Sequence, residues 1–267
     1  RVLSEVTRLY HIDENRIYLV GGSMGGCGTW NIGLSYPDLF AAIAPIMGPT
    51  EFSFWNGPAR DPLTSEREFI NAKYSSLTQS ENALNMPVFC NHGVVDDIVP
   101  VEQSRKMVAR FKELGYPIKY VEHGGVAHGG FDPQMDYDIY EWFEDKQSNP
   151  IPERVVYKTA DLKHNSAYWI AIHQFSDLLQ CAEIDARILA KNEIDIRTKN
   201  VAQFSIDLNK QLFSFDDPLR VKINGVMSTV DFSDDQEQVI FYLIDEKWSA
   251  KKPAKEPTVE KTPQLAG

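Results

Sequence analysis

A Gly-x-Ser-x-Gly sequence follows a short apolar stretch near the start of the chain, at Gly21 to Gly25. The residues directly before it, Ile17 to Val20, are aliphatic or aromatic, as expected of a strand. A serine at a tight turn from a strand into a helix has a strained backbone. We therefore expect glycines two positions to either side, because side chains there would clash. Gly21 and Gly25 meet this requirement around Ser23, so the run has the sequence form of a nucleophile elbow.

The residues after Ser23 have helical character as far as Leu34. A helix that begins at Met24 would direct its free backbone amides towards any negative charge that forms beside the serine. This part of the sequence therefore predicts a strand, a tight turn and a helix that together could stabilise an oxyanion.

Four short apolar segments alternate with helical ones in the first half of the chain, which predicts an α/β fold with a parallel sheet covered on both faces. The strands are expected at residues 15–20, 41–46, 87–91 and 118–122, and the clearest helices at Val101 to Leu114 and Pro133 to about Lys146. The long stretch from Pro49 to Met86 lies between two of these strands and is expected to form a lid or substrate wall.

The pattern changes after Pro150-Ile151-Pro152, where closely spaced strand segments replace the alternation. Asn224-Gly225 between two apolar runs is a strong signal for a two-residue hairpin. We therefore predict an α/β domain over residues 1–149, a small all-β sandwich over 153–248 and a disordered tail over 249–267.

Composition excludes several classes of partner and cofactor. The net charge of −11 argues against nucleic acid and against an anionic membrane surface, because both need a basic patch. No run of about 18 apolar residues indicates a membrane span. Cys27, Cys90 and Cys181 are far apart and lack metal-ligand spacing. We expect no metal and no organic cofactor, and the sequence does not define an oligomeric state.

A carboxylate and a histidine follow two of the later predicted strands. Asp96 lies in the loop after residues 87–91, and His128, flanked by glycines, lies in the loop after 118–122. Asp97 and His123 are the alternatives, with Asp97 expected to cap the loop and His123 to end the strand. The chain order Ser, Asp, His is the order of an α/β-hydrolase triad, in which an imidazole activates the serine and a carboxylate orients the imidazole.

With these motifs, residues 13 to about 145 resemble the α/β-hydrolases of the prolyl-oligopeptidase and esterase branch. The resemblance rests on the Gly-x-Ser-Met-Gly-Gly elbow, the His-Gly-x-x-Asp-x-x-Val-Pro loop that starts at His92, and the glycine-flanked histidine. It implies that Ser23 is the nucleophile, Asp96 the acid and His128 the base, with the Met24 N–H as an oxyanion-hole donor. His92 is expected to be structural.

The resemblance also places several strands and a second oxyanion-hole loop before the elbow, where this chain has only about 14 residues. With helical spacing from Val2 that lacks a cap, this predicts an N-terminal truncation whose missing segment held the second donor.

The function that the resemblance implies is that of a serine hydrolase. It would cleave carboxylic esters through an acyl-enzyme, with acylated polysaccharides as candidate substrates. A prolyl-oligopeptidase-like peptidase is the alternative, and a non-catalytic module that binds carbohydrate or protein is the rival of another class. The region around Tyr168-Trp169 resembles the appendage of bacterial secreted esterase-like proteins, which implies a periplasmic or secreted location.

Overall fold

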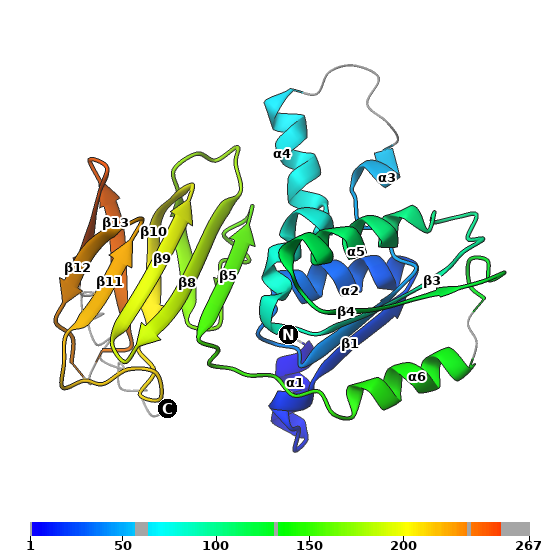
Figure 1. Cartoon of the computed structure of the whole chain (residues 1–267), viewed down its shortest axis with the longest axis horizontal. Helices are drawn as coiled ribbons and strands as arrows, with labels where there is room; N and C mark the ends of the chain where they lie inside the picture. The colour runs from blue at the N-terminus through cyan, green and yellow to red at the C-terminus, as the bar shows by residue number, and fades with distance from the viewer. Residues whose placement is uncertain (1, 57–63, 131–132, 234–235, 252–267) are drawn as a thin grey trace, which may run out of the picture.

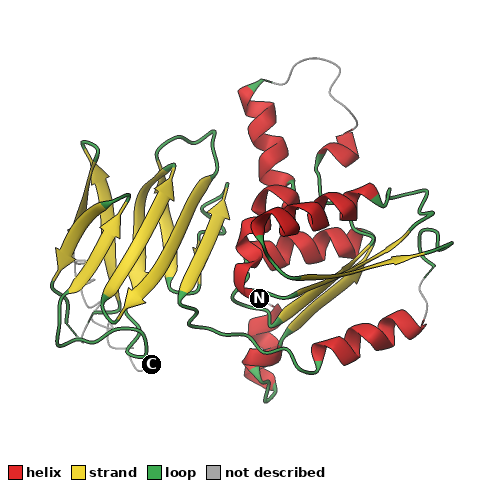
Figure 2. Ribbon diagram, viewed as in Figure 1, coloured by secondary structure: helices red, strands yellow, loops and turns green. Residues whose placement is uncertain are grey.

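The computed structural model describes residues 2–56, 64–130, 133–233 and 236–251 (Figure 1). A four-stranded parallel sheet with helices comes first, and two five-stranded sheets follow it along the chain (Figure 2). The helices of the described residues are all too short or too polar to cross a membrane.

The parallel sheet has the strand order β1-β2-β3-β4, with each neighbouring pair parallel. Its strands are β1 Tyr18–Gly22, β2 Ala42–Ile46, β3 Val88–Gly93 and β4 Ile118–His123. All four predicted strands are present, but β1 is shifted from the expected 15–20. Residues Glu14–Arg16 form a 3-10 turn, η1, because the Asp13 side chain accepts a hydrogen bond from the Asn15 N–H and caps it.

Helices cover both faces of this sheet (Figure 1). They are α1 Val2–Leu9, α2 Met24–Ser35, α3 Ser53–Asn56, α4 Ser65–Tyr74, α5 Glu102–Leu114 and α6 Pro133–Phe143, with a 3-10 segment η2 at Ser76–Asn85. Ile43 of β2 packs in one cluster with α2 and α5, whereas its neighbours Ala42 and Ala44 pack with α6. Because successive strand residues point to opposite faces and helices cover both faces, β2 is apolar throughout.

The stretch from Pro49 to Met86, predicted to be a lid or substrate wall, is not all separate from the core. It holds α3 and α4, while residues 57–63 lie outside the described part. The η2 segment near its end is part of the core: Ser80 and Ala83 are buried, and Ala83 packs in the same cluster as α2 and α5. Helices α3 and α4 project from the body of the molecule (Figure 1).

The second half of the chain forms two five-stranded sheets, with the orders β14-β13-β10-β7-β6 and β12-β11-β9-β8-β5. Their strands are β5 Arg154–Thr159, β6 Ser166–Ala167, β7 Ile170–Phe175, β8 Ala182–Ala190, β9 Glu193–Lys199, β10 Val201–Asp207, β11 Leu219–Ile223, β12 Val226–Val230, β13 Gln238–Ile244 and β14 Lys247–Lys251. The pair β9 and β11 is parallel, and the other pairs are antiparallel. One cluster of buried apolar residues draws on both sheets, so the two sheets share a core.

The hairpin predicted at Asn224-Gly225 joins β11 to β12, and both turn residues have positive φ values, 49° and 88°. The predicted tail begins too early, because residues 249–251 belong to β14. Ser249 pairs with Tyr242, and Trp248 and Ala250 pack against the shared core. Residues 252–267 lie outside the described part of the chain.

Candidate active site

Ser23 occupies the single residue between β1 and α2. Its φ is 55° and its ψ is −117°, a region that residues with a side chain rarely adopt. The Ser23 N–H donates to the carbonyl oxygen of Ile46 at the end of β2, at 2.9 Å, and holds the turn against the sheet. The backbone conformation is therefore that of a strained elbow, as predicted.

The glycines around the serine have different constraints. A Cβ on Gly21 would lie 2.5 Å from the carbonyl oxygen of Gly25, so Gly21 is needed. A Cβ on Gly25 would meet no atom within 4 Å, so the expected clash at that position is wrong. The second crowded position is Gly26, where a Cβ would lie 2.4 Å from the Ile46 oxygen. The close approach is between the start of α2 and the end of β2.

Asp96 lies in the loop that follows β3 and is almost fully buried. Its Oδ1 accepts hydrogen bonds from the Ile98 N–H at 3.0 Å and from the Val99 N–H at 2.8 Å. Burial raises the pKa of the Asp96 carboxyl, but the hydrogen bonds from His128, Val99 and Ile98 together hold that pKa below its ordinary value. The site therefore contains an ionised, acceptor-only carboxylate at neutral pH.

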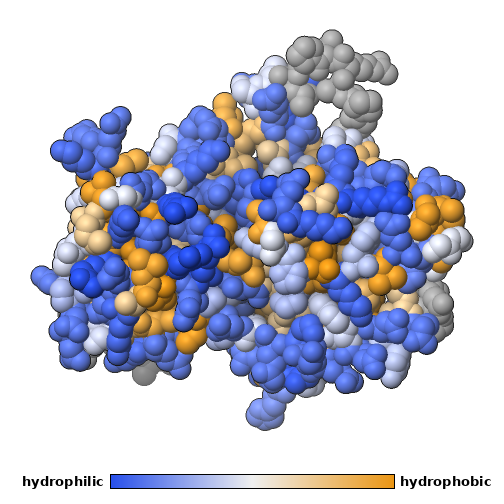
Figure 3. Space-filling view, viewed as in Figure 1, coloured by the Kyte–Doolittle hydropathy of each residue, from blue (hydrophilic) through white to orange (hydrophobic). Residues whose placement is uncertain are grey.

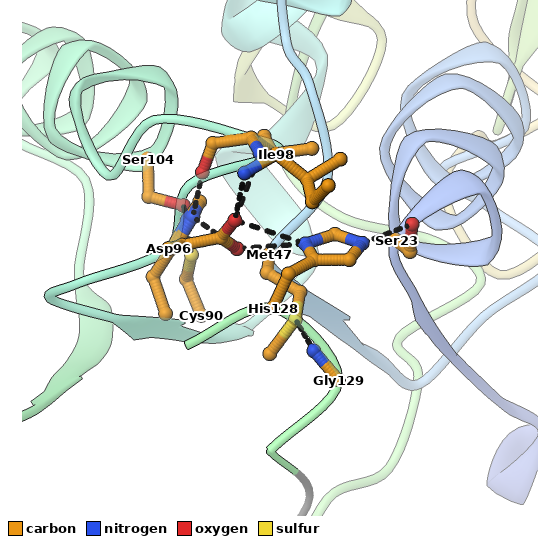
Figure 4. Close-up of polar contacts among 10 residues, drawn as sticks. Ser23, Met47, Cys90, Asp96, Ile98, Ser104, His128 and Gly129 are labelled. Atoms are coloured by element: carbon orange, nitrogen blue, oxygen red, sulfur yellow. Dashed lines mark hydrogen bonds and ion pairs between the residues drawn. The ribbon is translucent and has the colours of Figure 1, made fainter. Parts of the chain in front are cut away.

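His128 lies between this carboxylate and the serine (Figure 4). Its Nδ1 is 2.8 Å from Asp96 Oδ2, and its Nε2 is 2.8 Å from Ser23 Oγ. A carboxylate can only accept, so Nδ1 carries the hydrogen and Nε2 is free to accept the serine hydroxyl. The three side chains that the sequence singled out are thus joined by hydrogen bonds in the order Ser, His, Asp.

The alternative residues lie elsewhere. The Asp97 side chain is exposed, and no hydrogen bond joins it to the described residues; the loop is capped by Asp96 itself, contrary to the expectation for Asp97. His123 ends β4, and its Nε2 contacts Asn91 Oδ1 at 3.0 Å. Neither side chain takes part in the Ser23–His128–Asp96 arrangement.

Met47 supports the histidine loop and was not found from the sequence. It follows β2 with a φ of 41°, is buried, and its Sδ accepts a hydrogen bond from the Gly129 N–H at 3.4 Å (Figure 4). No spacing rule links position 47 to position 129, because the contact depends on the tertiary packing of two loops.

Met24 is the first residue of α2, so its N–H has no partner within the helix and lies next to Ser23. Exposed apolar side chains lie on the segments that hold the site: Met24 is 77% exposed, and Val95 and Ile98 of the Asp96 loop are more than half exposed. Hydrophobic residues gather at the right-hand end of Figure 3, over the region where β3 and β4 end in Figure 1. Within the described residues, no three His, Cys, Asp or Glu side chains come close enough together to hold a metal ion.

Residues 1–148 match the sequence profile of peptidase S9, the prolyl oligopeptidase family. The chain belongs to the prolyl oligopeptidase family. The matched residues include the whole parallel sheet and all three side chains of the candidate site, whereas β5 to β14 lie beyond the match. The prolyl oligopeptidase part therefore has an α/β-hydrolase-like fold, a parallel sheet with helices, and further, mostly antiparallel sheets follow it.

Two relatives are each about a quarter identical to the chain over the residues that align. An uncharacterized secreted protein of Arthroderma benhamiae is 26% identical over 227 residues, 79% of this chain and 24% of that protein. A bifunctional acetylxylan esterase/xylanase of Neocallimastix patriciarum is 25% identical over 113 residues, 42% of this chain and 13% of that protein. The chain thus spans a quarter or less of each of these relatives. Among solved structures, a thermostable esterase is 30% identical with a TM-score of 0.43, covering 55% of this chain and 35% of that chain.

Proposed function

We propose that the protein is a serine hydrolase that cleaves carboxylic esters through an acyl-enzyme. Ser23 is the nucleophile, His128 the general base and acid, and Asp96 the carboxylate that orients His128. The observation that carries the proposal is the pair of 2.8 Å contacts that joins Ser23 Oγ to His128 Nε2 and His128 Nδ1 to Asp96 Oδ2. Membership of a family of serine hydrolases supports it.

In the first half of the reaction, Ser23 Oγ attacks the ester carbonyl carbon and its proton passes to His128 Nε2. The tetrahedral intermediate then collapses, the bond to the leaving alkoxide breaks, and the imidazolium returns the proton to that oxygen. Water repeats the sequence on the acyl-enzyme and releases the carboxylic acid and Ser23. The ionised Asp96 stabilises the imidazolium in both halves.

Negative charge on the carbonyl oxygen needs hydrogen-bond donors. We assign the Met24 N–H to this role, because it is a free amide at the start of α2, directly beside the nucleophile. The positive end of the α2 dipole adds to the same effect.

The choice of ester over peptide draws on the acetylxylan esterase relative, whose similarity is low, and on the exposed apolar side chains Met24, Val95 and Ile98 beside the site. These side chains would contact an acyl or aryl group. Acylated polysaccharides are the candidate substrates, and the secreted relative supports an extracytoplasmic location. A peptidase is the second candidate function, because the matched family is named for one.

We also propose that the chain has two domains, the hydrolase domain over 1–149 and a β-sandwich from 153 onwards. The single core shared by the two five-stranded sheets supports the sandwich description. The sandwich is extended to Lys251 in this proposal, because β14 ends there.

The test is covalent labelling with a fluorophosphonate, which reacts far faster with an activated serine than with an ordinary one. We expect one adduct, located on Ser23 by peptide mass spectrometry and absent from Ser23→Ala. A panel of p-nitrophenyl esters, feruloyl and acetyl esters, and peptide anilides then separates esterase from peptidase. A folded wild-type protein that is neither labelled nor hydrolyses any of these substrates would refute the proposed function.

A further inference from the structure

His92, the fifth residue of β3, is a buried histidine behind the candidate site. Both of its ring nitrogens have partners: Nδ1 is 2.7 Å from Ser104 Oγ of α5, and Nε2 is 2.8 Å from the carbonyl oxygen of Val99. Nε2 also lies 3.4 Å from Asp96 Oδ2, on the carboxylate that faces His128. The ring therefore spans the space between α5 and the loop that contains Asp96.

The partners fix the tautomer of this ring. The Val99 carbonyl can only accept, so Nε2 carries the hydrogen and Nδ1 must accept from the Ser104 hydroxyl. Ser104 Oγ in turn lies 3.3 Å from Cys90 Sγ, which donates to it (Figure 4). Burial raises the pKa of the Cys90 thiol to about 12, so the thiol keeps its hydrogen. Every hydrogen bond then points the same way, from Cys90 through Ser104 and His92 to Val99.

Val99 is the point at which this chain reaches the site. Its carbonyl accepts from His92, and its own N–H donates to Asp96 Oδ1 at 2.8 Å. A ring that holds the Val99 carbonyl therefore also fixes the amide that orients the Asp96 carboxylate. The same Nε2–H faces Asp96 Oδ2, so His92 acts on both carboxylate oxygens, one directly and one through the backbone.

The charge of the ring also matters. Burial lowers the pKa of His92, more than the hydrogen bond to Val99 and the nearby Asp96 raise it, so the ring is neutral. A neutral donor can hold the carboxylate without cancelling its charge, and the Asp96 charge stays available to the imidazolium that forms on His128.

We propose that His92, with its tautomer set by the Val99 carbonyl and its ring held in place by Ser104, is a positioning residue that fixes the Asp96 carboxylate for His128. This inference rests on the proposed function, because it assigns His92 a part in the same Ser23–His128–Asp96 site. It goes beyond the structural role expected from the sequence, since it specifies which atom carries the hydrogen and which contact depends on it.

The test uses Ser104, which contacts neither Asp96 nor His128 in the structure. Ser104→Ala removes the donor to His92 Nδ1 without adding atoms, and Ser104→Thr is the matched control that keeps a hydroxyl. We expect Ser104→Ala to lower the rate of fluorophosphonate labelling at Ser23 by about 10- to 100-fold, as small misplacements of reacting groups do. For ester hydrolysis kcat should fall while KM is unchanged, and Ser104→Thr should recover most of the rate. If Ser104→Thr does not fold, His92→Gln, which keeps a side-chain N–H donor, replaces it as the control against His92→Phe.

A second readout does not depend on activity. Proton and nitrogen NMR of histidine-labelled protein reports the His92 tautomer and the downfield proton shared by His128 Nδ1 and Asp96. The inference expects a hydrogen on His92 Nε2 in the wild type, and a shifted or lost downfield proton in Ser104→Ala.

A hydrogen on Nδ1, or a Ser104→Ala variant with unchanged labelling rate and unchanged downfield proton, would overturn the inference. If the wild type is not labelled at all, the proposed function fails. The downfield proton in Ser104→Ala then still decides whether His92 and Ser104 position Asp96.

Discussion

The tight packing behind Ser23 depends on Gly21 and Gly26 and not on Gly25. Gly21 faces the backbone of Gly25, and Gly26 faces the end of β2, so in both cases the obstacle is backbone that cannot rotate away. Gly25 faces open space, where a methyl group has room. The symmetric requirement that the motif predicts is therefore met on one side only.

Gly21→Ala and Gly25→Ala form a matched pair that tests this difference. Gly21→Ala places a carbon 2.5 Å from a backbone oxygen, and the forced shift should reduce the free energy of unfolding by about 1–3 kcal/mol. Gly25→Ala adds a helix-favouring residue to α2 and should leave stability unchanged or raise it by up to about 1 kcal/mol. Urea unfolding followed by circular dichroism measures both. Equal losses in the two variants would contradict the packing described for the elbow.

Asp96 and its neighbour Asp97 offer a second matched pair. In Asp96→Asn the neutral amide no longer stabilises the hydrogen on His128 Nδ1. The ring can then carry its hydrogen on Nε2, and in that tautomer Nε2 cannot accept from the Ser23 hydroxyl. We expect the ester hydrolysis rate to fall by about 10⁴-fold. Asp97→Asn changes an exposed side chain and should retain the wild-type rate. A large loss of hydrolysis rate in Asp97→Asn would contradict the assignment of Asp96 as the acid.

That Ser23, Asp96 and His128 lie together could be predicted because their residue types, their order and the strands before them are local features of the sequence. The partners of His92 could not, because Ser104 and Val99 become neighbours only when α5 packs against β3. Trp55, in the predicted lid or substrate wall, shows the same limit: a large apolar residue is more often buried, yet Trp55 is 55% exposed and packs edge-on against its neighbour Phe54. Contacts set by tertiary packing leave no pattern in a single sequence.

At the scale of elements, the parallel strands were predictable because each is a short apolar run between helical segments. The exact first and last residues of strands and helices were harder to predict. Strand β1 begins at Tyr18 because η1 turns the chain before it, and α6 ends at Phe143, three residues before the expected end. Helix α5 ends at Leu114, as predicted, and the next residue, Gly115, is a left-handed cap with a φ of 71°.

One exposed ion pair links α5 to β4 and gives a pH prediction. Arg105 binds both carboxylate oxygens of Glu122, at 2.8 and 2.7 Å, and these hydrogen bonds are the main reason why the pKa of Glu122 falls to about 2. The unfolded chain therefore binds more protons than the folded one between the ordinary pKa and about 2. The stability that this pair contributes is present above the ordinary pKa and is lost as the pH falls through the folded value.

Glu122→Gln should accordingly be less stable than the wild type at pH 7, by under about 1 kcal/mol because the pair is exposed to solvent. The difference should shrink below pH 4.5, the ordinary value, and vanish near pH 2. Glu102→Gln, which removes the other carboxylate beside Arg105, is the control and should show a smaller pH dependence. Urea unfolding between pH 2 and pH 7 measures the differences; one that stays constant with pH would exclude the linkage.

At the scale of the whole molecule, the edge of β5 joins the two halves. β5 is the edge strand of its sheet, and the η2 segment of the hydrolase part lies against it. The Asn82 side chain accepts from the Lys158 N–H at 2.7 Å and donates to the Lys158 carbonyl at 2.9 Å and to that of Leu34 at 2.8 Å. The Asn82 amide thus pairs with both backbone groups of Lys158, as a neighbouring strand would, at one position of this open edge. The sequence gives no sign of this junction, which makes the strands after Pro152 more than a tethered appendage.

Asn82→Ala should weaken the coupling between the halves. It removes the partner of the part-buried Lys158 backbone groups and of the buried Leu34 carbonyl, at a cost of about 1–3 kcal/mol. We expect the wild type to unfold in one calorimetric transition and Asn82→Ala to unfold in two, because the interface no longer makes the halves cooperative. Asn85→Ala, which loses a single hydrogen bond to the Arg154 carbonyl, is the control and should keep one transition.

Tryptophan fluorescence assigns each transition to one half of the chain. Trp30 lies in the core of the parallel-sheet part and Trp169 in the core of the β-strand part, so variants that keep only one of these tryptophans report on one half each. A single transition with an unchanged midpoint in Asn82→Ala would show that other contacts couple the two halves. Two hydrogen bonds would then be removed next: the one from the Tyr157 hydroxyl to the Ser35 carbonyl, and the one from the Tyr168 hydroxyl to the Pro37 carbonyl.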